Sequence, residues 1–174
     1  MHPNIELLTR FYTGLANGDI ATIRACYTPD VVYSDPVFHR LEGERAIAMW
    51  DMFFSRDDAM EVTFSDLVAD DTTGSGNWEA KYVFSKTGRP VHNYLHSQFV
   101  FANGHIAEHH DAFNVYRWSR MALGPIGTLA GWSPPLKSTL HRQSKALLDK
   151  HQAKMAGEGP PVPRHARTRS GSAS

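Results

Sequence analysis

The feature that most constrains this chain is the stretch GHIAEHHDAFNVYRW at 104–118. Its first residue, Gly104, follows Asn103, and this Asn-Gly pair is a strong hairpin signal. The alternating residues after it predict a strand over 105–117. Because alternate side chains of a strand point to one face, His109, Asp111 and Phe113 should lie together. A carboxylate among aromatic rings needs a partner, hydrogen bonds or a proton, so this face is the first candidate for chemistry.

Period-two patterns extend upstream of that strand. Residues 60–69, 78–85 and 91–102 each alternate and are separated by glycine-containing turns, which predicts an antiparallel sheet. On the strand 91–102 the inward set is expected to be Val91, Asn93, Leu95, Phe99 and Phe101. The outward set is then His92, Tyr94, His96 and Gln98.

Helical spacing dominates the first third of the chain. A first helix is predicted over 4–16, and Asp19 can cap a second helix whose apolar face includes Tyr27. A short strand over 30–35 should follow, and then a third helix over 44–55. Helices followed by an antiparallel meander indicate an α+β fold.

The C-terminal part has a different character. Residues 118–135 are apolar but broken by glycine and proline, and a helix is predicted near 135–154. We therefore expect a domain over 1–117 and a packed apolar loop and helix over 118–156. The last stretch, 157–174, is rich in proline, serine and arginine, which is typical of a disordered tail.

Composition excludes several classes of protein. Eighteen Lys and Arg balance eighteen Asp and Glu, which argues against nucleic acid or an anionic membrane as partner. The single cysteine, Cys26, rules out an internal disulfide and a thiolate metal cluster. His92 and His96 would lie about 13 Å apart on a strand, and no third ligand is evident beside His109 and Asp111, so no metal or cofactor is expected.

The sequence shows neither the pattern of a membrane span nor that of a signal peptide. No segment approaches the roughly 18 apolar residues of a membrane span, and the first residues do not have the basic and apolar regions of a signal peptide. We therefore expect a soluble, cytoplasmic protein.

Three motifs carry a resemblance to a known family. They are LLTRFYTGLANGDIATIRACYTPDVVYSDP at 7–36, Gly43 at the start of the third helix, and FVFANGHIAEHHDAF at 99–113. Together they resemble the SnoaL-like and ketosteroid isomerase-like branch of the nuclear transport factor 2-like superfamily, over about residues 4–117. The resemblance implies a cone, in which three N-terminal helices pack on a curved antiparallel sheet of four main strands and a short fifth. Such cones hold a deep apolar cavity.

The same resemblance implies a site. Asp111 matches the position on the last strand where SnoaL-like cyclases carry a cavity acid or a histidine. It would act as base or acid, with its pKa raised by burial, and His109 would be its partner. Asp35 resembles the superfamily position that enters the cavity from the helical side, and Tyr33 shares its face. The alternatives are that Asp111 and His109 only hold the strand end and that Asp35 only forms a turn.

Aromatic residues and one amide complete the expected cavity wall. These predicted substrate-binding residues are Tyr33, Trp50, Phe54, Trp78, Tyr82, Asn93, Phe99 and Phe113. Such walls favour a flat, apolar or polycyclic ligand.

Three functions compete on this pattern. The first is a cofactor-independent isomerase or cyclase acting on an apolar carbonyl or polycyclic compound. The second is a non-catalytic ligand-binding or dimerisation module. Epoxide hydrolysis is less favoured, because hydrolases of this fold resemble an Asp–Arg–Asp arrangement, whereas Arg89 falls in a turn and Arg117 at a strand end. A homodimer through the outer sheet face is expected, because Tyr94, His96 and Val100 are large for a solvated surface.

Overall fold

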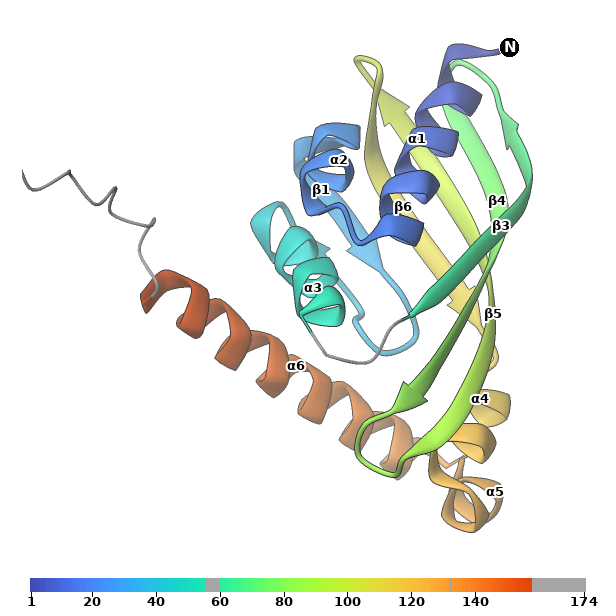
Figure 1. The fold of residues 1–174 in the computed structure, drawn as a ribbon, viewed down its shortest axis with the longest axis vertical. Helices are drawn as coiled ribbons and strands as arrows, with labels where there is room; N and C mark the ends of the chain where they lie inside the picture. Colours follow the sequence, from blue (N-terminus) through green and yellow to red (C-terminus); the bar gives the residue numbers. More distant parts are fainter. Residues whose placement is uncertain (56–59, 132, 158–174) are drawn as a thin grey trace, which may run out of the picture.

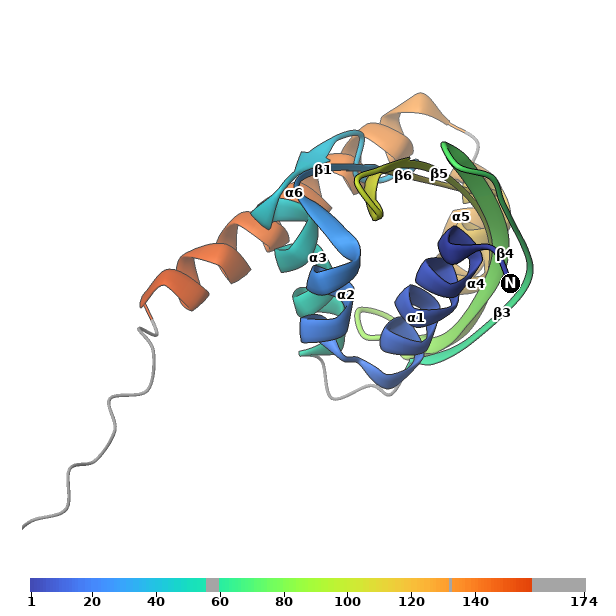
Figure 2. The ribbon, with the colours of Figure 1, turned by 90° about the horizontal axis from the view of Figure 1, so that it is seen from above.

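A computed structural model describes residues 1–55, 60–131 and 133–157 and shows helices lying inside the curve of a sheet (Figure 1, Figure 2). The predicted α+β class is confirmed. The helices before the long strands are α1 (Pro3–Asn17), α2 (Ile20–Cys26) and α3 (Glu44–Phe54). The strands are β1 (Tyr27–Ser34), β2 (Leu41–Glu42), β3 (Glu61–Ala69), β4 (Thr73–Phe84), β5 (Arg89–Ala102) and β6 (His105–Phe113). In the described residues they form one sheet, in the order β2-β1-β6-β5-β4-β3.

Strands β3 to β6 make the predicted antiparallel meander, and β1 joins it by pairing in parallel with β6. The register places side chains of the concave face in rows across the strands. Tyr33 lies beside His109, which lies beside Phe99. The next row joins Asp111 to Ser97. Beyond it come a row of Phe113, Leu95 and Trp78 and then a row of Asn93 and Ala80.

Helix α1 covers the first of these rows. Phe11 and Tyr12 are fully buried, and the Phe11 ring lies edge-on to His109 with the ring centres 5.3 Å apart. The helix ends at Gly18, whose left-handed backbone (φ 65°) returns its N–H to the last turn. The rows beyond α1 are therefore left to line a pocket.

The first strand begins earlier than the sequence predicts. Tyr27 was expected on the second helix, but that helix ends at Cys26 and Tyr27 opens β1. Tyr27 is buried and its ring packs against Phe11, so tertiary packing outweighs the local helical pattern.

Strand β4 also begins earlier, at Thr73 instead of residue 78. The glycines read as a turn are strand residues, and the turn is made upstream, where Asp70 accepts the backbone N–H groups of Thr72 and Thr73. At Gly74 the strand needs a residue without a side chain, because a Cβ there would lie 2.8 Å from the Phe101 ring.

The strand predicted over 105–117 stops at Phe113. Asn114 caps a helix instead, because its side-chain oxygen accepts the Arg117 N–H at 2.9 Å. The segment expected as a loop contains α4 (Val115–Leu123) and α5 (Pro125–Ala130).

The predicted C-terminal helix is present as α6 (Pro134–Gly157). Figure 1 shows that it starts near the β4–β5 hairpin and runs past α3. Lys86 bonds Gln143 at the first point, and Arg45 bonds Asp149 and Gln152 at the second. Most of the predicted tail, 158–174, lies outside the described residues. None of the described helices is both long and apolar enough to cross a membrane.

The close approach at Gly74 gives a test of this arrangement. Gly74→Ala should lower the free energy of unfolding by about 1–3 kcal/mol, because the added methyl group meets the Phe101 ring and the Val68 carbonyl oxygen. Ser75→Ala on the neighbouring residue is the control and should change it by less than about 0.5 kcal/mol. Urea denaturation measures both, and equal stabilities of the two variants would contradict the packing described.

Candidate functional site

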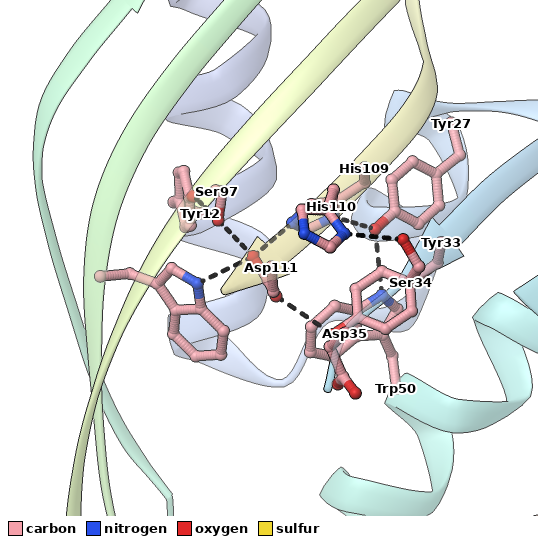
Figure 3. Close-up of polar contacts among 11 residues, drawn as sticks. Tyr12, Tyr27, Tyr33, Ser34, Asp35, Trp50, Ser97, His109, His110 and Asp111 are labelled. Carbon is pink, nitrogen blue, oxygen red and sulfur yellow. Dashed lines mark hydrogen bonds and ion pairs between the residues drawn. The ribbon is translucent and has the colours of Figure 1, made fainter. Parts of the chain in front are cut away.

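Asp111 lies at the centre of a buried polar network on the concave face (Figure 3). Its Oδ1 accepts hydrogen bonds from the Ser97 hydroxyl, from His109 Nε2 at 2.9 Å and from Trp78 Nε1 at 3.3 Å. Its Oδ2 accepts from the Tyr33 hydroxyl at 3.1 Å. Because four donors converge on one carboxyl group, the network suits an ionised carboxylate.

The pKa of Asp111 depends on burial and on the groups that contact the carboxylate, which act in opposite directions. Burial alone would raise the pKa, but the electrostatic interaction with His109 and the hydrogen bonds that the carboxylate receives outweigh burial and hold it below its usual value. The expectation of a raised pKa is therefore wrong, because the aromatic pattern did not reveal how many donors the fold brings to this residue. Asp111 stays ionised at neutral pH and is a weak proton acceptor.

His109 extends the network away from the carboxylate. Its Nδ1 lies 2.8 Å from the Tyr27 hydroxyl, whose oxygen accepts from Trp50 Nε1 at 3.1 Å. Its Nε2 donates to Asp111, and its Nδ1 is paired with the Tyr27 hydroxyl, so both ring nitrogens have partners. His109 is thus held from both sides and orients Asp111.

Tyr33 joins this network to a second carboxyl group. Its hydroxyl oxygen lies 2.9 Å from Asp35 Oδ2 and 3.1 Å from Asp111 Oδ2. A phenol has one hydrogen, so it donates to one of the two carboxyl groups at a time. The other contact becomes a hydrogen bond when Asp35 carries a proton and donates it to the phenol oxygen. The protonation of Asp35 therefore decides where the Tyr33 hydrogen points.

Asp35 follows directly after β1 and makes a tight turn. Its Oδ1 accepts the backbone N–H groups of Val37 and Phe38, both at 2.6 Å, and its own N–H donates to the Phe38 carbonyl at 2.8 Å. The other oxygen, Oδ2, is left for Tyr33. The two interpretations of Asp35, a turn former and a cavity acid, are thus compatible in one side chain.

The environment of Asp35 raises its pKa, whereas the environment of Asp111 lowers the pKa of that residue. Burial raises the pKa of Asp35 to about 6, and the charge of Asp111 adds to the increase. The hydrogen bonds from the backbone and from Tyr33 oppose burial without cancelling it. A carboxyl group with this pKa exchanges its proton near neutral pH, which suits general acid–base chemistry.

A pocket with a volume of about 160 Å³ lies beyond α1. It is bounded by the concave face, by α3 and by α6, and most of its lining is apolar. Its residues are Tyr33, Asp35, Val37, Phe38, Trp50, Met52, Phe53, Met60, Trp78, Ala80, Tyr82, Val83, Asn93, Leu95, Phe113, Trp118, Leu140, Ser144 and Leu147. The volume is below the roughly 300–1,000 Å³ of pockets for drug-sized ligands, so the shape suits a small molecule.

The pocket brings together most of the predicted site residues. They are Tyr33, Asp35, Trp50, Trp78, Tyr82, Asn93 and Phe113. His109 and Asp111 lie behind this wall, fully buried, and Asp111 is bonded to two residues of the wall, Tyr33 and Trp78. Phe99 is a core residue under α1, and Phe54 packs beside Gly18.

Several lining residues were not predicted from the sequence. Phe53, the neighbour of Phe54 on α3, faces the pocket in its place. Trp118 enters from α4 and donates to the Tyr82 hydroxyl at 2.7 Å. Leu140 and Leu147 come from α6. Their helical spacing was visible in the sequence, but the element on which the helix packs was not.

Metal binding and arginine-assisted chemistry both lack their residues in the described part of the chain. No group of three or more His, Cys, Asp or Glu side chains there is placed to hold a metal ion. Likewise, within 1–55, 60–131 and 133–157, no arginine lines the pocket. Arg89 donates to the Met121 carbonyl, and Arg117 stacks over the Tyr94 ring on the outer face.

Comparison with known proteins identifies the domain. A family model described as a SnoaL-like domain matches residues 8–109. Among curated proteins, no sequence matches this chain. The matched range includes Asp35 and ends at His109, so the pocket residues from Phe113 onward lie beyond it.

Solved structures share the fold. An LEH-like epoxide hydrolase from M. tuberculosis is 23% identical with a TM-score of 0.60, covering 73% of this chain and 94% of that one. A protein from Jannaschia sp. CCS1 assigned as a SnoaL-like polyketide cyclase is 16% identical with a TM-score of 0.63, covering 71% and 93%. TerC, co-crystallised with polyporic acid, is 15% identical with a TM-score of 0.58, covering 68% and 97%.

The raised pKa of Asp35 predicts how stability depends on pH. The folded pKa of about 6 lies above the ordinary value of 3.8, so the fold loses stability as the pH rises through about 6. Asp35→Asn removes this loss. Relative to the wild type, the variant should gain about 2 kcal/mol in unfolding free energy between about pH 4.5 and about pH 8.

Urea denaturation at the two pH values measures this difference. Asp30→Asn changes an exposed carboxyl group of the same strand and is the matched control, which should show no such gain. If the difference in unfolding free energy between Asp35→Asn and the wild type is the same at both pH values, the prediction of a raised pKa for Asp35 is wrong.

Proposed function

The chain belongs to the SnoaL-like family, and we propose that it is a cofactor-independent enzyme that moves a proton on a small, largely apolar carbonyl compound. One observation carries the proposal: Asp35, with a pKa of about 6, lines an apolar pocket and is linked through Tyr33 to the buried carboxylate of Asp111. Isomerisation and cyclisation both fit this arrangement.

In the first step the ionised Asp35 takes a proton from the carbon next to the carbonyl group of the substrate. The C–H bond breaks, an O–H bond forms on Asp35, and the electron pair moves into an enolate. For isomerisation, Asp35 then returns the proton to another carbon. For cyclisation, the enolate carbon forms a bond to a second carbonyl carbon of the same molecule, the π bond of that carbonyl breaks, and Asp35 gives its proton to the resulting alkoxide.

Tyr33 responds to each change at Asp35. When Asp35 is ionised, Tyr33 donates its hydrogen to one of the two carboxylates at a time. When Asp35 gains a proton, it donates to the Tyr33 oxygen and the Tyr33 hydrogen points to Asp111. Asp35 is therefore the catalytic residue of the proposal. Asp111 and His109 are positioning residues, because they act through Tyr33.

A non-catalytic binding protein is the second candidate. It is favoured by Asp111, whose oxygens are already occupied by four donors from the protein itself. Epoxide hydrolysis is less favoured by the pocket, whose described lining contains no arginine. The TerC structure with polyporic acid supports a small-molecule ligand for either candidate.

Substitution of Asp35 separates the two candidates. After a screen with enones, polycyclic ketones and epoxides, Asp35→Asn should lower kcat about 10²-fold or more, because it removes the proton acceptor. Asp30→Asn is the control and should keep wild-type turnover. Binding of a screened compound without turnover by the wild type would favour the binding protein.

Tyr33→Phe tests the link between the carboxyl groups. The hydrogen bond from Tyr33 lowers the pKa of Asp35, so its loss should move the acid limb of the pH–rate profile to higher pH. An unmoved acid limb would show that Asp35 and Tyr33 are not coupled in catalysis.

We also propose that the outer sheet face forms a homodimer. Tyr94 is 43% exposed and Val100 is 38% exposed on that face. Light scattering at micromolar concentration should give the mass of two chains, and Tyr94→Glu should give the mass of one. Thr13→Glu on the exposed side of α1 is the control, and a monomeric wild type would refute the dimer.

A further inference from the structure

Asn93 on β5 has an unusual environment for an amide. It is only 7% exposed and lines the pocket. In the described residues its side chain makes no hydrogen bond. Its amide atoms are open to the pocket, because Thr28 Oγ1 is the one buried side-chain polar atom without a partner among the described residues. Its donors and its acceptor are therefore available to a molecule in the pocket.

Ser144 on α6 presents a second polar group to the same pocket. Its hydroxyl also makes no hydrogen bond with any residue that the structure describes. Ser144 lies beyond residues 8–109, the range of the SnoaL-like domain match. This part of the wall is therefore added by the C-terminal segment of this chain.

The two polar regions of the pocket are separated by apolar residues. Asn93 and Ser97 lie four positions apart on β5, which is about 13 Å along a strand. Ser97 bonds Asp111 near the Tyr33 end of the pocket. The row that contains Leu95 and Trp78 lies between Ser97 and Asn93. A ligand that fills the space would meet polar groups at both ends and an apolar wall in the middle.

We propose that Asn93 and Ser144 form a second polar subsite, which binds an oxygen atom of the ligand remote from Asp35. The inference rests on the proposed function, which gives the end of the pocket near Tyr33 and Asp35 its role. It narrows the substrate class to compounds of about naphthalene size that carry two oxygen functions on an apolar skeleton. Either a carbonyl or a hydroxyl oxygen fits the second subsite, because an amide and a hydroxyl both donate and accept.

Two matched probes test the subsite by equilibrium binding. The first is 2-naphthol, with one oxygen, and the second is 2,6-dihydroxynaphthalene, with two. Quenching of the tryptophan fluorescence reports binding, because Trp50, Trp78 and Trp118 line the pocket. The wild type should bind the two-oxygen probe about fivefold more tightly, the value of one additional hydrogen bond.

Asn93→Leu should abolish this preference and leave the affinity for 2-naphthol within about twofold. Ser144→Ala should reduce the preference in the same direction. Gln98→Leu is the matched control, because Gln98 is an exposed amide on the other face of the same strand. It should keep the wild-type preference. Thermal melts establish that each variant is folded, and Asn93→Ala replaces Asn93→Leu if the latter is not.

Two results would overturn the inference. One is a wild type without a preference for the two-oxygen probe, including one that binds neither probe. The other is a preference that persists in the folded Asn93 variant. The proposed function fails separately, since Asp35→Asn should keep the probe preference while losing turnover. If the preference is present and Asp35→Asn retains turnover, the subsite stands and the role of Asp35 does not.

Discussion

The hydrogen bonds to Asp111 organise the concave face. Four strands each contribute one donor to this carboxylate: Tyr33 from β1, His109 from β6, Ser97 from β5 and Trp78 from β4. A buried anion is tolerated only when such partners are present, so the strands must keep the register that delivers them. The rows of side chains that line the pocket follow from that register.

The same interaction explains why two aspartates that share one phenol behave differently. The donors around Asp111 outweigh burial and lower its pKa, whereas those around Asp35 do not, and its pKa rises to about 6. A fixed anion behind the wall and an exchangeable proton on the wall result from this difference. Two carboxyl groups with separated pKa values are a usual way to assign one stable charge and one proton carrier.

Much of the fold was predictable, because hydrophobic period and turn residues report local structure. Tyr33 and Asp35 were expected on one face because they lie two positions apart, and in the structure the Tyr33 hydroxyl contacts Asp35 Oδ2. The roles of Asp111 and Asp35 were not predictable, because they depend on donors far away in the sequence. Trp78 is one example, and it lies 33 residues from Asp111.

The end of the pocket away from Asp35 depends on elements that local patterns could not place. Helix α6 has little apolar surface, and Leu148 is its buried residue in the described chain. Polar contacts hold it, such as His151 to Asp51 at 2.7 Å and His141 to the Val37 carbonyl at 2.7 Å. The Asp35 end of the pocket therefore lies within the family domain. The other end combines both parts of the chain, because Asn93 lies within residues 8–109 whereas Ser144, Leu140 and Leu147 come from α6 beyond them.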